Sequence, residues 1–355
     1  MLQGSMRTHR LLAGAVLLTG MALPGGSALA ASITDSYFVG VGDSYTGPYA
    51  PRMSRNLHRS WLEQLDAHNS GGSFTNLGVS GTTTATVQAS GDSHEQLPAA
   101  QTAIGSSGAG IVFIGLGVND FSAVLQSGAV MTQGEADAVA DAAFSNLSDL
   151  VNALTTQNPD VQFVIANSVD RGSWAGRSGA AYDHNRAVNT AATQRYNQLI
   201  ADNFANTSGF AVVDSFSLME DMLAGDPADS NVGTPGQLFI AGQEIVIDPA
   251  LSLADDQPAD HFWADDAHAG SVFQGLFANV VLTALELELG IDAGAEGLLS
   301  IDDIFTTANG AGGATLVASD TGYTFDYGAY VVPEPGSVVA LLVGAGLMVG
   351  RRRRA

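Results

Sequence analysis

The sequence predicts an α/β fold, a three-layer α/β/α sandwich around a mostly parallel five-stranded sheet. Short apolar runs alternate with longer segments of helical periodicity along the chain, the order expected for a parallel sheet with crossover helices. Residues 110–117 are apolar or glycine throughout, as in a central strand buried on both faces. Polar turns follow several of these runs, and the carboxyl ends of parallel strands are where such folds bind ligands.

The predicted elements follow from periodicity. The first strand starts at Tyr37 and ends at the turn Gly42-Asp43, which a strand cannot absorb. Further strands are predicted at 74–77, 110–117, 161–166 and 210–214. Helices are predicted where apolar residues recur at every third or fourth position, over 53–67, 133–156, 182–204 and 271–289. We therefore place one α/β domain at residues 31–290.

Two segments are less regular. Residues 215–261 are acidic, contain four prolines and allow a small hairpin around 238–247. This insertion is a candidate lid over the cleft, with a passive surface excursion as the alternative. Residues 291–331 are rich in Gly, Thr and Asp, and we expect an extended segment leading to the C-terminus.

Both ends of the chain carry targeting patterns. Residues 1–30 run from basic through apolar to small residues, which predicts a secretory signal peptide cleaved near Ala30. Residues 332–355 contain Pro333-Glu334-Pro335, an apolar run and four arginines, and this combination resembles the PEP-CTERM sorting signal of Gram-negative bacteria. The resemblance implies transient membrane association, an exosortase-type processing enzyme as partner, and delivery to the envelope or outside. A plain transmembrane anchor is the alternative.

The amino-acid composition excludes some kinds of site and disfavours some classes of binding partner. The chain has no Cys, so disulfides and thiolate metal sites are excluded. Outside the two ends it holds 7 Arg, no Lys and 35 Asp and Glu residues, a formal charge of about −28. Such a charge disfavours nucleic acid and anionic lipid surfaces as partners. The alternative reason for the acidity is that it keeps an exported protein soluble.

Four short blocks carry the candidate chemistry. They are Gly42-Asp-Ser44, Gly78-Val-Ser-Gly81-Thr, Gly117-Val-Asn119-Asp120 and Asp265-Asp-Ala-His268. The first three follow predicted strands and the fourth precedes the last predicted helix, so a common edge of the sheet can gather them. In type and order the blocks resemble those of the SGNH, or GDSL-type, hydrolase family, whose fold is flavodoxin-like.

The resemblance implies a role for each block. Ser44 matches the nucleophile, His268 the general base and Asp265 the acid that orients it. The backbone N–H groups of Ser44 and Gly81 and the side-chain amide of Asn119 match the oxyanion hole, and neither metal nor organic cofactor is implied. These types suit acyl transfer, because a serine hydroxyl needs a base and the tetrahedral intermediate needs preplaced donors.

Some details depart from the family pattern or stay open. Tyr45 stands where the family usually has Leu, which puts substrate preference in question, and Ala269 stands where Pro is frequent. Asp266 competes with Asp265 for the orienting role. The other histidines at 94, 184 and 261 lack an acid in that arrangement, and we expect them on the surface or in loops.

The expected function is therefore an exported serine hydrolase. It would cleave carboxylic esters through an acyl-enzyme, as a lipase, an esterase or a carbohydrate O-deacetylase acting on a small-molecule or polysaccharide ester. The alternative is a non-catalytic envelope or matrix protein that uses the same scaffold to bind polysaccharide.

Overall fold

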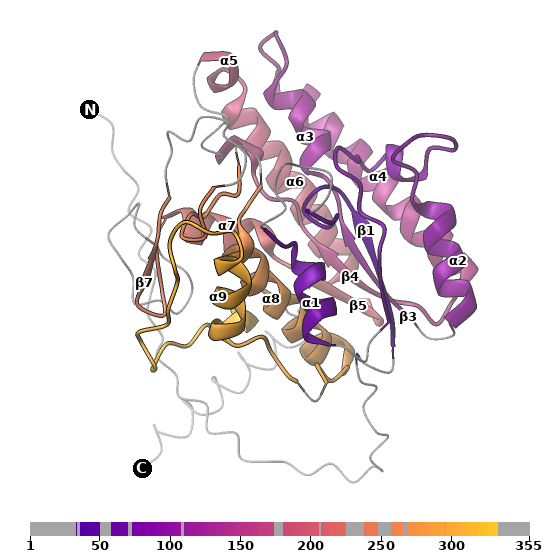
Figure 1. Ribbon diagram of the computed structural model, residues 1–355. Helices are drawn as coiled ribbons and strands as arrows, with labels where there is room; N and C mark the ends of the chain where they lie inside the picture. The colour runs from indigo at the N-terminus through magenta and orange to yellow at the C-terminus, as the bar shows by residue number, and fades with distance from the viewer. Residues whose placement is uncertain are drawn as a thin grey trace, which may run out of the picture. The chain divides into compact units, whose positions relative to one another are not determined.

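The computed structural model describes most of residues 33–332. The described ranges are 33, 36–49, 58–69, 73–107, 110–173, 180–205, 207–224, 238–247, 257–265, 268–294 and 296–332 (Figure 1). By compactness the chain divides into residues 1–30 and 31–355, and all described residues belong to the second unit. The expected signal peptide and, apart from Val332, the expected sorting signal lie outside the described residues.

The central sheet has five strands, all parallel, in the order β2-β1-β3-β4-β5. Their bounds are β1 Tyr37–Gly42, β2 Ser73–Asn76, β3 Gly110–Gly115, β4 Gln162–Ala166 and β5 Phe210–Val213. The predicted strands and fold class are confirmed. Gly42 of β1 pairs with Gly115 of β3, and Gly115 pairs with Ala166 of β4, so three neighbouring strands end level with one another.

Alternate residues of the strands enter two separate cores. Val112 and Ile114 of β3 join one core and Phe113 joins the other, because successive strand side chains point to opposite faces. One face is covered by α2 Leu97–Ser107, α3 Val118–Leu125, α4 Gln133–Gln157 and α6 Arg186–Phe204. The other is covered by α1 Trp61–His68, α7 Ser215–Ala224, α8 Ser271–Leu289 and α9 Ile301–Asn309 (Figure 1). This arrangement is the predicted three-layer sandwich.

The long helices match their predictions closely. The helix predicted at 133–156 is α4, and the one predicted at 271–289 has the bounds of α8. The segment predicted at 182–204 is divided into α5 Ala180–Asp183 and α6. The described part of the segment predicted at 53–67 is helical only from Trp61, where Ser60 and Glu63 form a reciprocal capping box.

Helix α8 is the hydrophobic centre of its layer. Within the described ranges it is the helix whose length and apolar composition would suffice to cross a membrane, and 72% of its apolar window is buried inside the fold. It packs against α1, α9 and the sheet. A helix that is buried on most sides by other helices and a sheet is apolar around most of its circumference, and the composition of α8 fits that position.

The region after β5 differs in part from the prediction. The expected hairpin near 238–247 is present as β6 Leu238–Ile240 and β7 Gln243–Ile245, whereas α7 was not predicted. Residues 225–237 and 248–256 of the candidate lid lie outside the described residues. The prediction of an extended segment over 291–331 is wrong at residues 301–309, which form helix α9 and pack on α8.

The chain after α9 returns to the sheet. Val331 forms an antiparallel bridge with Val213 of β5. The N–H of Asp214 donates to the carbonyl of Tyr330 at 2.8 Å, and that of Val332 donates to the carbonyl of Val212 at 2.9 Å. Residues 291–332 therefore belong to the α/β domain and extend it beyond the predicted boundary at 290.

Candidate active site

Ser44 lies in a tight turn at the carboxyl end of β1. The carbonyl of Asp43 accepts hydrogen bonds from the N–H groups of Thr46 and Gly47, at 3.2 and 2.8 Å. Gly42 leads into this turn, and a Cβ there would lie 2.7 Å from the carbonyl oxygen of Gly115. The sequence thus turns sharply because glycine allows close contact with β3, and it leaves Ser44 half-buried at the strand end.

Asp265 and His268 form a buried pair just before α8. The Nδ1 atom of His268 lies 2.9 and 3.1 Å from the two carboxylate oxygens of Asp265, and the backbone N–H of His268 donates to the nearer oxygen at 2.7 Å. The exposed fraction is 2% for Asp265 and 6% for His268. The three-residue spacing places the carboxylate on Nδ1, so Nε2 is the ring nitrogen that the carboxylate does not contact. Asp266, the competing acid, lies outside the described residues.

The imidazole of His268 packs on the turn that carries Ser44. Its ring centroid lies 5.8 Å from that of Tyr45 and 5.9 Å from that of Tyr49. The Tyr49 hydroxyl donates to the carbonyl of Ala269 at 3.0 Å and accepts from Gln274 Nε2 at 2.6 Å. These contacts bring the loop before α8 to the end of β1, across more than two hundred residues of chain.

The two candidate oxyanion-hole blocks also meet here. The N–H of Val79 donates to the carbonyl of Gly42 at 3.0 Å, which places the loop after β2 beside the Ser44 turn. Gly81 has φ +86°, a left-handed conformation suited to glycine. Asn119, in the first turn of α3, donates from Nδ2 to the carbonyl of Thr82 at 3.0 Å. The first three blocks are therefore contiguous in space.

An arginine that the sequence did not indicate completes this cluster. Arg171 donates to Asn119 Oδ1 at 3.2 Å and also to the hydroxyl of Ser122. Since the amide oxygen of Asn119 faces a guanidinium, its NH₂ group is directed to the opposite side. No local motif marks Arg171, because its contacts depend on how β4 and α3 are arranged in the fold.

Two carboxyl groups lie beside the candidate residues, Asp43 buried and Asp120 half-buried. Burial raises the pKa of Asp43 to about 7, against the lowering effects of the Tyr45 N–H and the Arg171 charge. Burial also raises the pKa of Asp120, although it accepts hydrogen bonds from the N–H and hydroxyl of Thr84 at 3.0 and 2.6 Å. Asp120 thereby ties α3 to the loop that follows Gly81.

A family comparison adds to this geometry. The family model described as "GDSL-like Lipase/Acylhydrolase family" matches residues 35–234, more than half of the chain. The chain belongs to this family. As a GDSL-family protein it is an ester hydrolase. The matched residues include Ser44, Gly81 and Asn119 and end before Asp265 and His268, so these two are assigned from the blocks and from the contacts described above.

Solved structures similar to this GDSL-family chain include two ester hydrolases. The extracellular lipase from Streptomyces rimosus is 19% identical, with 57% of this chain and 86% of that chain covered and a TM-score of 0.39. Axe2, an acetylxylan esterase from Geobacillus stearothermophilus, is 16% identical, with 74% and 97% covered and a TM-score of 0.41. No curated protein matches the chain.

Other histidines of this GDSL-family chain also have partners. His94 Nδ1 lies 2.7 Å from Asp92 Oδ1, and His261 Nδ1 lies 3.1 Å from Asp260 Oδ1. In these two pairs the acid stands two positions before His94 and one position before His261, not three as in Asp265–His268. Their pairs are more exposed than Asp265–His268, and His184 Nε2 lies 2.9 Å from the backbone carbonyl oxygen of Ser127.

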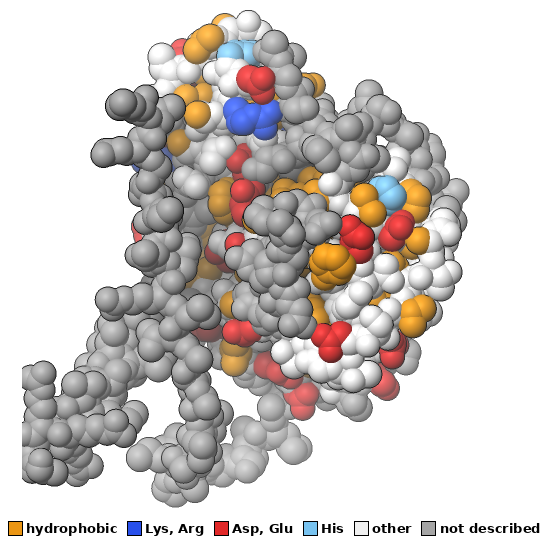
Figure 2. Space-filling view, turned by 90° about the vertical axis from the view of Figure 1, so that its left-hand side faces the viewer, with side chains coloured by type: hydrophobic (Ala, Val, Ile, Leu, Met, Phe, Trp, Pro, Cys, Tyr) orange, Lys and Arg blue, Asp and Glu red, His pale blue; other side chains and the backbone are white. Residues whose placement is uncertain are grey.

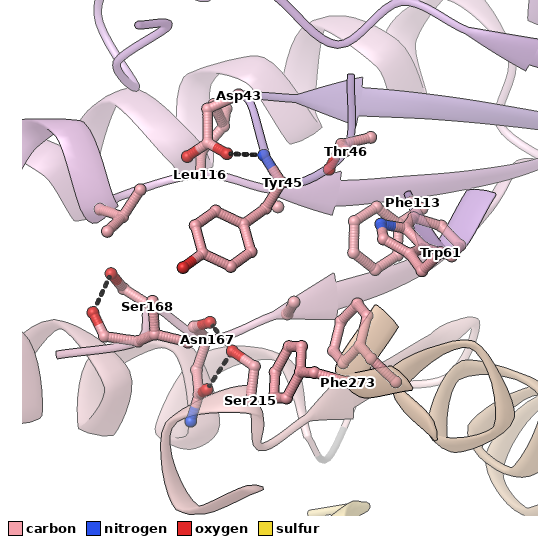
Figure 3. A pocket seen from close by; sticks show the side chains of 15 residues that line it. Asp43, Tyr45, Thr46, Trp61, Phe113, Leu116, Asn167, Ser168, Ser215 and Phe273 are labelled. Carbon is pink, nitrogen blue, oxygen red and sulfur yellow. Dashed lines mark hydrogen bonds between the residues drawn. The ribbon is translucent and has the colours of Figure 1, made fainter. Parts of the chain in front are cut away.

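A pocket lies next to the Ser44 turn, on the α8 face of the sheet (Figure 3). It encloses about 430 Å³ of space, part of it open to solvent. Asp43 and Tyr45, the two neighbours of Ser44, both line it. Across the ranges that the structure describes, no cluster of three or more His, Asp or Glu side chains is arranged to hold a metal ion.

Proposed function

We propose that this GDSL-family hydrolase uses Ser44 as nucleophile, His268 as general base and Asp265 as the orienting acid, and that it cleaves carboxylic esters through an acyl-enzyme. The observation that carries the proposal is the buried Asp265–His268 pair, whose imidazole packs on the Tyr45 ring directly beside Ser44. Nδ1 is occupied by the carboxylate, which supports Nε2 as the base.

The reaction follows from these groups. Nε2 of His268 takes the hydroxyl proton as Ser44 Oγ attacks the ester carbonyl. Asp265 holds the tautomer and stabilises the imidazolium that forms. The imidazolium then protonates the leaving alcohol, and a water molecule activated by the same nitrogen hydrolyses the acyl-enzyme. Burial of the pair strengthens the interaction between carboxylate and imidazolium.

The oxyanion would be stabilised by the N–H groups of Ser44 and Gly81 and by Asn119 Nδ2. The contacts of Asn119 with Thr82 and Arg171 hold its amide in one orientation. Donors fixed before the reaction need no reorganisation when charge develops, and each contributes about 3 kcal/mol to the transition state.

A labelling experiment tests the catalytic assignment. We expect a fluorophosphonate probe to modify Ser44 of the purified protein, and His268→Ala to abolish labelling without loss of fold. His261→Ala is the matched control, because His261 has an acidic neighbour but lies in a more exposed pair, and it should label normally. A protein that takes neither the probe nor any short-chain aryl ester would instead support the non-catalytic, polysaccharide-binding alternative.

We further propose export and action at the cell envelope or outside it. The three-part pattern of residues 1–30 and the PEP-CTERM-like residues 332–355 support it, with an exosortase-type enzyme as processing partner. Expression of the full chain in a Gram-negative host should yield a protein whose N-terminus, read by mass spectrometry, lies near Ala31. An intact Met1 in the soluble cytosolic fraction would contradict export.

The substrate would be a neutral or cationic ester, either a small molecule or an acetylated polysaccharide. The acidic body of the chain, about −28 in formal charge, supports this because it repels anionic surfaces. Release of acetate from an acetylated exopolysaccharide, compared with hydrolysis of acylglycerols, separates O-deacetylase from lipase activity.

A further inference from the structure

The pocket beside Ser44 has an apolar wall suited to a hydrocarbon group. Besides Tyr45, four aromatic side chains line it: Trp61, Phe113, Phe273 and Phe277. Polar groups line another part, among them Asn167, Ser168 and Ser215. Burial raises the pKa of the lining Asp43 to about 7, so near neutral pH much of this carboxyl is uncharged.

The ring of Tyr45 stands inside this pocket. Figure 3 shows it between Ser168 and the pair formed by Trp61 and Phe113. Burial, the largest cause, raises the pKa of the Tyr45 phenol well above its usual value, so the ring is neutral. The same ring packs on His268 and belongs to the residue next to Ser44. An acyl group on Ser44 would therefore begin beside Tyr45.

We propose that this pocket receives the acyl chain of the ester and that the Tyr45 ring, which stands between its polar and its aromatic parts, restricts the enzyme to short acyl groups. The inference rests on the proposed function and names its substrate class: esters of acetate and other short aliphatic acids. A longer chain would have to displace the ring before it reached the aromatic wall.

Removal of the ring should open that wall to longer chains. Each methylene that moves from water to an apolar site increases the binding constant about fourfold, which corresponds to about 0.8 kcal/mol. Several such methylenes would enter the space that the ring leaves. We therefore expect the ratio of kcat/KM for octanoate to kcat/KM for acetate to rise at least tenfold in Tyr45→Ala.

The experiment measures this ratio with p-nitrophenyl acetate, butyrate, octanoate and dodecanoate. Tyr45→Phe is the matched control, since it keeps the ring and should keep the preference for short chains. Tyr45→Leu serves as a second variant if Tyr45→Ala fails to fold. In the double variant Tyr45→Ala/Ala166→Leu, a larger side chain at another lining residue should fill the space again and lower the ratio.

The outcomes separate the inference from the proposed function. An active wild-type enzyme that prefers octanoate, or a ratio that stays unchanged in both Tyr45→Ala and Tyr45→Leu, overturns the acyl pocket and leaves the serine mechanism in place. A wild-type protein that takes no fluorophosphonate and hydrolyses no ester overturns the mechanism itself, and the pocket proposal with it.

Discussion

Arg171 is the residue whose contacts say most about how the candidate oxyanion hole is maintained. It donates to the amide oxygen of Asn119 and to Ser122 of the same helix. A guanidinium presents several donors in a fixed plane, so one side chain sets the orientation of the Asn119 amide. Through Asn119 it would act as a positioning residue.

Arg171→Met should lower kcat about tenfold and leave KM within about twofold. Loss of a complete oxyanion donor costs roughly a hundredfold or more, and here the donor remains but its orientation is no longer fixed. Arg171→Lys should recover part of kcat. Arg195→Met is the control, because Arg195 pairs with Asp141 at 2.7 Å on the outer surface and should not affect kcat. A change in KM alone would contradict the positioning role.

Asp43 makes stability depend on pH. Its pKa is raised by burial from 3.8 to about 7, so between these values the folded state binds the proton that the unfolded state has released. The free energy of unfolding therefore decreases as pH rises across this window, by at most about 1.4 kcal/mol per pH unit from this group. Above about pH 7 the loss is complete.

Asp43→Asn should remove that dependence, because the amide can still accept from the Tyr45 N–H but does not ionise. We measure the free energy of unfolding of both proteins with urea at several pH values. We expect the value for the wild type, relative to that for the variant, to decrease from pH 4 to 7. A constant difference across this range would show that the pKa of Asp43 is the same in the folded and unfolded states.

The sequence predicts the contacts of this site when the two residues lie close together along the chain. The spacing of Asp265 and His268 is enough to predict their contact, because both lie in one short loop. Arg171 and Asn119 are 52 positions apart, and nothing local joins them. The partner of His94 was missed although Asp92 is only two positions away, since the prediction considered only an acid three residues before the histidine.

At the scale of elements, the pairing of α8 with α9 is the least expected feature. Gly275 of α8 faces Ile304 of α9, and a Cβ at Gly275 would lie 2.7 Å from Ile304 Cγ1. The two helices therefore approach closely because one has no side chain at the contact. Ile304 is fully buried there.

Ile304→Ala should lower the free energy of unfolding by about 2–5 kcal/mol, from lost apolar burial and the cavity that remains. Val317→Ala is the control, because Val317 is 63% exposed and should change stability by less than about 0.5 kcal/mol. Urea denaturation measures both. Equal effects would mean that α9 is not part of the cooperative fold.

Long periodic helices and apolar strands were predictable, whereas the short helices α3 and α9 were not. The helices α4 and α8 repeat their pattern over several turns, whereas α3 begins within the polar motif at Asn119 and α9 lies in a Gly- and Thr-rich region. A signal for α9 was nevertheless present. Ser300 and Asp303 form a reciprocal capping box, and Ser-x-x-Asp before an apolar run predicts a helix start.

At the scale of the whole molecule, negative charge dominates. The full chain has a formal net charge of −23, and acidic side chains outnumber basic ones on the described face in Figure 2. Like charges on one folded body repel one another, and salt screens that repulsion. The described structure contains few ion pairs between Arg and acidic groups to offset it.

The melting temperature should therefore rise as NaCl is increased from about 20 to 200 mM, since the Debye length falls to about 10 Å or less over that range. Differential scanning calorimetry at constant pH measures the shift, with sucrose at matched osmolality as a control for uncharged solute effects. A melting temperature that falls with NaCl would mean that attractive pairs outweigh the repulsion.

The bridge between Val331 and Val213 also determines at which residue a shortened recombinant chain can end without loss of the fold. The segment from Tyr330 to Val332 pairs with the last strand of the sheet, whose N–H and C=O groups would otherwise form an open edge. Open edges recruit strands from other chains and promote aggregation. A recombinant chain that ends at 332 keeps its edge covered, whereas one that ends at 290 exposes a template for intermolecular β-pairing and should precipitate during expression.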